Sequence, residues 1–220
     1  MSSACLAFLS FIDALVALHK RIPIAPLCKS SSSSRSYYCD VCEFIRAKLS
    51  KICEYEKVGI AEAHFFPFMR FLNYEDEGGG LAAHIDLSRT LPKDQVVLRS
   101  EKANRQTSVS DVLATSSHTF LFYLTDCRQG GETVLLRSMK TAVLASGQST
   151  YTGPPENVVV SVGPVRGRLF MFPHACPHAG LLVSCTPKLL LRGEVLLQSP
   201  VVQSHAEPTP VMKQSVPFAC

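Results

Sequence analysis

Three side chains in this sequence are suited to hold one metal ion together: His84, Asp86 and His178. His84 and Asp86 are two positions apart, so on a β-strand their side chains would point to the same face, roughly 6–7 Å apart along the chain. Two imidazoles and one carboxylate are the ligand set that non-haem Fe(II) prefers, and they leave coordination positions open for substrate chemistry. A chain that uses these residues in this way would be an oxygenase.

These residues alone do not decide the matter. A single His-x-Asp tripeptide is weak evidence, because such tripeptides arise by chance, and hydrogen-bonded structural histidines explain the pattern equally well. His174 also competes with His178 for the role of the distant ligand, since both lie in the segment Phe172-Pro-His-Ala-Cys-Pro-His178.

Short β-like segments separated by Gly and Pro make up most of the chain after His64. We predict strands over residues 68–74, 118–125, 132–136, 158–162, 167–172 and 189–197. Several short strands with turn signals between them indicate a sandwich or a barrel. The predicted fold is mainly β, a double-stranded β-helix (jelly roll), which suits a metal held between two sheets.

The N-terminal part predicts helices that support this β core. Ala4 to Leu18 is mostly apolar but contains Asp13, and it is too short and interrupted for a transmembrane helix. No positive charge precedes it, as a signal peptide would require, so a core-docking helix is favoured over a targeting segment. Residues 20–36 resemble a flexible Ser/Pro-rich linker, and residues 39–57 have helix-like apolar spacing. The predicted divisions are 1–36 (helix and linker), 37–198 (main domain) and 199–220 (loosely ordered tail).

Composition narrows the function classes. The chain has 220 residues, 46% of them hydrophobic, which suffices for one domain with a sizeable core. Its net charge of +4 comes from scattered basic residues, so nothing indicates a nucleic-acid surface. The odd number of nine cysteines, without an N-glycosylation acceptor, favours reduced thiols and an intracellular, cytoplasmic protein. N-terminal targeting stays open as the alternative, and the sequence does not indicate an oligomeric state.

Seven motifs in order carry a family resemblance. They are Arg70-Phe-Leu-Asn-Tyr74, His84-Ile-Asp86, Thr119-Phe-Leu-Phe-Tyr-Leu124, Gly130-Gly-Glu-Thr133, Gly167-Arg-Leu-Phe-Met-Phe-Pro-His174, His178-Ala-Gly180 and Lys188-Leu-Leu-Leu-Arg-Gly-Glu-Val195. In this order they resemble the Fe(II)- and 2-oxoglutarate-dependent dioxygenases, particularly the branch that contains the prolyl 4-hydroxylases. The ordered set is far more specific than any single motif, whereas residues 1–60 lie outside it. The resemblance implies that His84, Asp86 and His178 bind Fe(II), with His174 next to the site.

The resemblance also implies a binding site for the co-substrate 2-oxoglutarate. Its far carboxylate needs a buried cation, and the family places a Lys or Arg about ten residues after the distant histidine. Lys188 meets this spacing, but Arg192 lies four residues further along the same strand face, and its guanidinium suits a carboxylate better. Both remain candidates. Tyr74 and Tyr123 are candidates to donate hydroxyl groups to the co-substrate, although plain core packing explains them nearly as well.

The resemblance therefore predicts hydroxylation of a substrate, with a protein prolyl residue as the leading candidate and with release of succinate and CO2. Fe(II) and 2-oxoglutarate are the expected cofactors, and ascorbate is a further candidate. Three alternatives remain: a metal-binding pseudo-enzyme that acts as an interaction module, a dioxygenase acting on a small molecule, and a metal-independent, cupin-like structural domain. Substrate contacts are expected from residues 87–117, read as an insertion or lid, and from the 140–157 loop.

Overall fold

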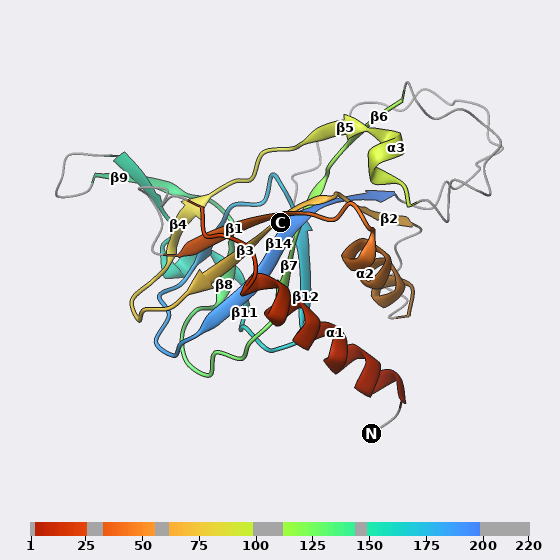
Figure 1. Cartoon of the computed structure of the whole chain (residues 1–220). Helices are drawn as coiled ribbons and strands as arrows, with labels where there is room; N and C mark the ends of the chain where they lie inside the picture. The colour runs from red at the N-terminus through yellow and green to blue at the C-terminus, as the bar shows by residue number, and fades with distance from the viewer. Residues whose placement is uncertain (1–2, 26–32, 56–61, 99–111, 144–148, 199–220) are drawn as a thin grey trace, which may run out of the picture.

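The computed structural model describes residues 3–25, 33–55, 62–98, 112–143 and 149–198. The predicted C-terminal tail (199–220) and most of the serine tract lie outside these residues. All the strand pairs in the described part are antiparallel, and most of them belong to two sheets, a large one and a small one. Figure 1 shows the helices α1 and α2 on one side of this β core.

The large sheet has the strand order β1-β3-β14-β7-β12, and β2 pairs with the far end of β14. Its strands are β1 (Ser34–Cys39), β2 (Glu62–Phe65), β3 (Phe68–Tyr74), β7 (His118–Tyr123), β12 (Leu169–Pro173) and β14 (Lys188–Gln198). The small sheet has the order β11-β8-β13-β4. Its strands are β4 (Leu81–His84), β8 (Thr133–Leu136), β11 (Val158–Val162) and β13 (His178–Gly180).

The remaining elements lie around these sheets. Two further strand pairs, β5 with β6 and β9 with β10, extend from opposite ends of the β core in Figure 1. The bounds are α1 (Ser3–His19), α2 (Phe44–Tyr55), β5 (Thr90–Pro92), α3 (Lys93–Val96), β6 (Leu113–Thr115), β9 (Lys140–Val143), β10 (Ser149–Thr152) and the 3-10 turn η1 (Pro155–Asn157). Within the described residues, none of the helices is long and apolar enough to cross a membrane.

Alternation along β14 gives the large sheet two different faces. Leu189 and Leu191 are buried in the cluster that contains the helix residues Phe11 and Leu49. Because side chains alternate along a strand, Lys188 and the residues at every second position after it face the opposite way, toward the small sheet. Burial of each large apolar side chain in such a cluster stabilises the fold by roughly 1.5–3 kcal/mol.

A second apolar cluster lies between the two sheets. Leu72, Tyr123 and Leu190 from the large sheet pack there together with Val183, and Leu135 of the small sheet packs against them. Two antiparallel sheets that face each other across a shared core form a β-sandwich, the architecture to which the jelly roll belongs. The predicted mainly β jelly roll with supporting N-terminal helices is thus confirmed.

Several element bounds differ from those predicted. The helix expected over residues 39–57 begins only at Phe44, and the residues before it, from Ser34, form β1, which pairs with β3. Residues 34–36 were predicted to lie in a linker, because a serine-rich stretch does not show the apolar alternation of a strand. Residues 87–117, read as an insertion, contain β5, α3 and β6 around the small cluster of Phe66, Val96 and Ala114.

Candidate metal centre

The three predicted ligands come together at the edge of the small sheet. His84, at the end of β4, is paired in register with His178, at the start of β13, and their rings lie 4.2 Å apart. β4 ends at His84, so Asp86 lies just after the strand and not on it. The backbone N–H of Asp86 instead donates to the carbonyl of His174 at 3.1 Å. The carboxylate nevertheless reaches both imidazoles.

Distances among the ligand atoms suit a single ion. The Asp86 carboxylate lies 3.8 Å from Nε2 of His84 and 3.5 Å from Nε2 of His178. One ligand atom from each of these three residues lies within 4.8 Å of the other two, and among the described residues they form the group found able to hold a metal. His174 is not a member of that group. The geometry therefore favours His178 as the distant ligand.

Backbone carbonyl groups determine which ring nitrogens can bind a metal. Nδ1 of His84 lies 2.8 Å from the carbonyl oxygen of Ala82, and Nδ1 of His178 lies 3.0 Å from that of Cys176. A carbonyl oxygen can only accept, so Nδ1 carries a hydrogen in both rings, and Nε2 is the nitrogen that a neutral ring can offer to a metal. Burial, followed by the neighbouring His84, lowers the pKa of His178 to about 4. His178 is therefore neutral at pH 7, as a metal ligand must be.

Asp86 is kept ionised by its surroundings. Burial alone would raise the pKa of this carboxyl group, but Arg192, the Thr119 hydroxyl and the two imidazoles outweigh burial and lower it. The Arg192 guanidinium lies 2.5 Å from Oδ1 of Asp86, and the Thr119 hydroxyl donates to Oδ2 at 2.5 Å. Arg192, one of the two cations proposed for 2-oxoglutarate, is thus engaged with a metal-ligand candidate.

A chain of hydrogen bonds behind Asp86 explains the position of His174. Because the Thr119 hydroxyl gives its hydrogen to Asp86, Nδ1 of His174, 3.0 Å away, must donate to Thr119. Nε2 of His174 lies 2.9 Å from the Ser116 hydroxyl, which also lies 3.5 Å from the Glu194 carboxylate. Burial lowers the pKa of His174, which favours the neutral form. His174 therefore supports Asp86 through Thr119 and does not point its lone pair at the metal centre.

Thr119→Val is expected to weaken metal binding about 10- to 100-fold, the usual effect of removing a hydrogen bond to a ligand. The variant takes away the donor to Asp86 and leaves the Nδ1 hydrogen of His174 without its acceptor. Titration of the protein with Mn(II) measures the change. Thr115→Val is the matched control, because the Thr115 hydroxyl bonds Thr90 on an exposed surface. Equal affinity in the two variants would contradict this role of Thr119.

Lys188 lies in a different environment from Arg192. It is buried, at 2% exposure, and its ammonium group lies 4.8 Å from the centre of the Tyr74 ring. Burial lowers its pKa to about 8, although Cys127 and Glu132 act in the opposite direction. A buried ammonium group requires a partner, and a carboxylate is the natural one. Lys188 thus has the surroundings expected of an anion site.

The two predicted tyrosines lie at the same end of the interior. Lys188 is paired in register with Tyr74, and Tyr123 is paired with Leu190. The Tyr123 hydroxyl donates to Thr133 at 2.8 Å. Both phenols are buried, and burial raises the pKa of each, to about 12 for Tyr123, so both keep their hydrogens at neutral pH.

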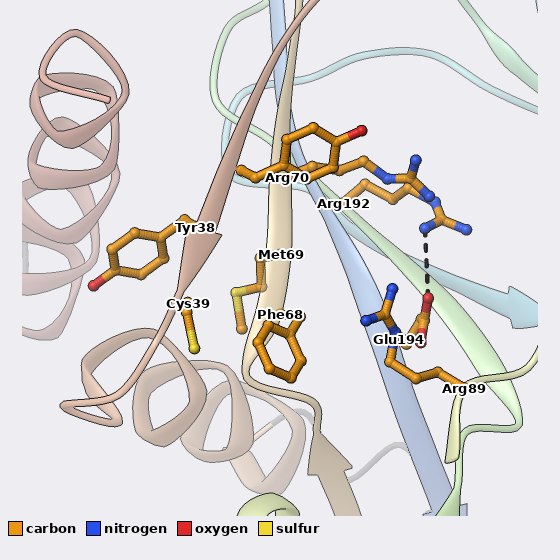
Figure 2. Close-up of a pocket in the computed structure, with 9 residues that line it drawn as sticks. Tyr38, Cys39, Phe68, Met69, Arg70, Arg89, Arg192 and Glu194 are labelled. Atoms are coloured by element: carbon orange, nitrogen blue, oxygen red, sulfur yellow. Dashed lines mark hydrogen bonds and ion pairs between the residues drawn. The ribbon is translucent and has the colours of Figure 1, made fainter. Parts of the chain in front are cut away.

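A pocket of about 420 Å³ opens on the other side of Arg192, and sequence reasoning did not find it. We call it the arginine pocket. The nine residues that line it are drawn in Figure 2, and they are Tyr37, Tyr38, Cys39, Phe68, Met69, Arg70, Arg89, Arg192 and Glu194. Of these, only Arg89 comes from the segment 87–117, where substrate contacts were expected. The signal in the sequence that could have indicated this pocket is Arg70, a charged residue within the otherwise apolar strand Phe68–Tyr74.

Comparison with known proteins gives structural matches only. No protein-family model matches the chain, and neither does any curated protein sequence. The fold is similar to a prolyl-4-hydroxylase from Pseudomonas putida, with 16% identity, a TM-score of 0.47, and coverage of 86% of this chain and 88% of that one. It is also similar to an oxidoreductase of the 2OG-Fe(II) oxygenase family from Burkholderia pseudomallei (10% identity, TM-score 0.48, coverage 84% and 78%).

A third similar structure is HygX from Streptomyces hygroscopicus with nickel and 2-oxoglutarate bound (15% identity, TM-score 0.48, coverage 85% and 78%). The matches thus include prolyl hydroxylases and 2-oxoglutarate-Fe(II) oxygenases, the group that the sequence motifs indicated. At this identity and TM-score the likeness adds nothing to the assignment of function, which depends on the geometry of the site.

Proposed function

We propose that this protein is an Fe(II)- and 2-oxoglutarate-dependent dioxygenase that hydroxylates its substrate. The observation that carries the proposal is the convergence of His84, Asp86 and His178, whose ligand atoms lie within 4.8 Å of one another. Each histidine turns Nδ1 to a backbone carbonyl and Nε2 to the Asp86 carboxylate. This donor set fits Fe(II), because two neutral imidazoles and one carboxylate on one side leave the other side open.

The chain's own residues have distinct tasks in this proposal. His84, Asp86 and His178 hold the metal, and Thr119 and Arg192 orient Asp86. When bound, iron and 2-oxoglutarate supply the oxidising chemistry, in which O2 is consumed, 2-oxoglutarate is converted to succinate and CO2, and a substrate C–H bond becomes C–OH. Lys188 binds the far carboxylate of 2-oxoglutarate, because Arg192 is already paired with Asp86. Tyr74 and Tyr123 border that site and exclude water from it.

The affinity for 2-oxoglutarate is expected to fall above about pH 8. Burial lowers the pKa of Lys188 to about 8, so below this pH its ammonium group is charged and above it the charge is lost. Each further pH unit should therefore weaken binding about tenfold, whereas both carboxylates of the ligand stay ionised. Binding of N-oxalylglycine to the Mn(II) protein from about pH 7 to about pH 9.5 measures this. Lys188→Arg keeps its charge, so a slope that persists in this variant would contradict the role of Lys188.

A thermal-shift experiment with Mn(II), with and without N-oxalylglycine, tests the proposal against its alternatives. Stabilisation by Mn(II) and further stabilisation by N-oxalylglycine support a metal- and 2-oxoglutarate-binding site. Stabilisation by metal alone would favour the metal-binding pseudo-enzyme. No response to either would exclude the metal centre and leave the cupin-like structural domain. Fe(II)-dependent release of succinate then separates an enzyme from a binding protein.

The substrate that we propose first is a prolyl residue of a protein, on the strength of the resemblance in the sequence motifs. A small molecule is the alternative, because one fold accommodates many substrates. Hydroxyproline in a peptide incubated with the protein, Fe(II) and 2-oxoglutarate would identify a prolyl residue as the substrate.

The six cysteines described in the structure are free thiols, which supports an intracellular location as part of the proposal.

A further inference from the structure

We propose that the arginine pocket binds a carboxylate group of the substrate, and that Arg70 is the residue that recognises it. The inference rests on the proposed function, because it assigns a substrate class to the same centre. The pocket adjoins that centre through Arg192, whose guanidinium lines the pocket and contacts Asp86. A substrate held by Arg70 would therefore lie beside the metal ligands.

The charged side chains of the pocket are unequally paired. Arg192 is paired with Asp86 and lies 3.8 Å from Glu194, the pair marked in Figure 2. Arg89 is paired with the same Glu194 at 3.2 Å. Arg70 has neither an ion pair nor a side-chain hydrogen bond within the described part of the chain. Three arginines thus line a pocket with one carboxylate, and Arg70 is the one of the three that has no ion pair among the described residues, although it also feels the charge of Asp86.

Arg70 lies beside another arginine in the large sheet. It lies on β3 in register with Arg192 on β14 and with Tyr37 on β1. Figure 2 shows the side chains of Arg70 and Arg192 next to each other and directed the same way. Two adjacent like charges repel each other, and an anion between or before them relieves this repulsion. The arrangement is therefore complementary to an anion.

Arg70 remains charged in this setting. Burial, and after it the neighbouring Arg192, lower its pKa to about 10, although the Asp86 carboxylate acts in the opposite direction. The guanidinium is consequently protonated at neutral pH while it lies partly out of water. A charge removed from water needs a partner, and the planar fork of an arginine fits the two oxygens of a carboxylate.

The remaining walls indicate what surrounds the carboxylate. Phe68 contributes an aromatic ring that is 41% exposed, and the Arg89 guanidinium lies 5.5 Å from the centre of this ring. Tyr37 is also exposed. A volume of about 420 Å³ lies within the range of small-ligand sites. The pocket thus fits a carboxylate attached to an apolar or aromatic group.

The pocket is separate from the site proposed for 2-oxoglutarate. Lys188 and Arg192 are four residues apart on β14, which is roughly 13 Å along a strand. Arg70 is paired with Arg192, whereas Lys188 is paired with Tyr74. Lys188 and Arg70 therefore lie at different positions along the sheet and can bind different anions.

The experiment uses benzoate and its neutral isostere benzamide as probes. The full chain is first saturated with Mn(II) and N-oxalylglycine, so that the co-substrate site is filled. Ligand-detected NMR then measures the dissociation constants of both probes. We expect benzoate to bind the wild-type protein at least about tenfold more tightly than benzamide. Arg70→Met should abolish this preference, Arg70→Lys should keep part of it, and the exposed matched control Arg137→Met should keep all of it.

Any other outcome contradicts the inference that Arg70 binds a carboxylate of the substrate. Equal binding of the two probes by the wild type would mean that the pocket does not select an anion. An undiminished preference in Arg70→Met, with an unchanged melting temperature, would place the anion elsewhere. Loss of N-oxalylglycine binding in Arg70→Met would assign Arg70 to the co-substrate. If the wild type does not bind N-oxalylglycine at all, the proposed function fails, and the comparison of benzoate with benzamide still tests the pocket.

A second pair of probes distinguishes the source of the carboxylate. The capped dipeptides acetyl-Pro-Glu-amide and acetyl-Pro-Gln-amide differ only in this charge. Preference for the Glu peptide that disappears in Arg70→Met would assign the carboxylate to an acidic side chain of a peptide substrate. Preference for benzoate without preference for the Glu peptide would assign it to a small-molecule acid.

Discussion

Replacing His178 by alanine is expected to abolish metal binding and, with it, all Fe(II)-dependent formation of succinate. His178 supplies the one candidate ligand that is both buried and held by the register of the small sheet. Two ligands, His84 and Asp86, would remain, and Arg192 would still neutralise the carboxylate. We expect the affinity for Mn(II) to fall by more than about hundredfold, beyond the effect of losing a supporting hydrogen bond. Calorimetric titration and a succinate assay provide the measurements.

His118→Gln is the control for this experiment. His118 lies on β7 with its Nδ1 near the hydroxyl of Ser117, and it is not among the metal-ligand candidates. It should bind Mn(II) as the wild type does. Since alanine at position 178 also leaves a cavity, His178→Gln, which preserves most of the volume, should lose the metal as well. Retention of Mn(II) by both variants at position 178 would disprove the metal centre.

Lys188→Met is expected to remove the response to 2-oxoglutarate while the metal still binds. The ammonium group is the buried cation on the co-substrate side of Asp86, and a lost charge-assisted bond inside a protein weakens binding by about tenfold to hundredfold. The variant should not unfold. With a pKa lowered to about 8, the charged form costs the folded protein roughly 3 kcal/mol, which methionine does not incur. The dissociation constant of N-oxalylglycine and the melting temperature are the measurements.

Lys140→Met is the matched control for Lys188→Met, because Lys140 is an exposed lysine on β9. Lys188→Arg should restore part of the affinity if charge is what matters. An Arg192→Met variant that loses N-oxalylglycine binding, together with a Lys188→Met variant that retains it, would exchange the roles proposed for the two cations.

The strands were predictable where apolar and polar residues alternate or run continuously. Residues 68–74 and 158–162 were predicted as strands and form β3 and β11. β1 was missed because its residues, Ser34–Cys39, are mostly polar and follow a serine tract. It is a strand because it lies at the edge of the large sheet and pairs with β3 along its length. Tertiary pairing here outweighs local propensity.

The ligand residues were predictable because they lie in short sequence motifs. Their electrostatic partners were not predictable, because these lie far away in the chain. His84 and Asp86 are neighbours in the chain, and spacing suffices to connect them. The contact between Arg192 and Asp86 joins a residue of β14 in the large sheet to one that follows β4 of the small sheet, and spacing along β14 could not reveal it. For the same reason the choice between Lys188 and Arg192 stayed open in the sequence. The structure supplies the missing information, since one cation has a carboxylate partner and the other faces Tyr74.

The arginine pocket could not be predicted at all. Its walls come from β1, β3, β14 and the residue Arg89, which are distant in the chain and meet only in the folded sheet. An arginine such as Arg70 within an apolar strand shows that a charge is buried, but it does not show what surrounds that charge. Only the folded structure shows which of the arginines has no ion pair among the described residues.

The division of the site between the two sheets has a mechanical consequence. The metal ligands sit on and just after strands of the small sheet, and β4 is an edge strand attached to β13 by a short pairing. A metal ion bound by His84, Asp86 and His178 would therefore cross-link β4 to β13 and stabilise this edge of the small sheet. Lys188 belongs to the opposite sheet. A dicarboxylate bound by both the metal and Lys188 would connect the small sheet to the large sheet. It would restrict relative motion of the two sheets, which the metal alone does not restrict.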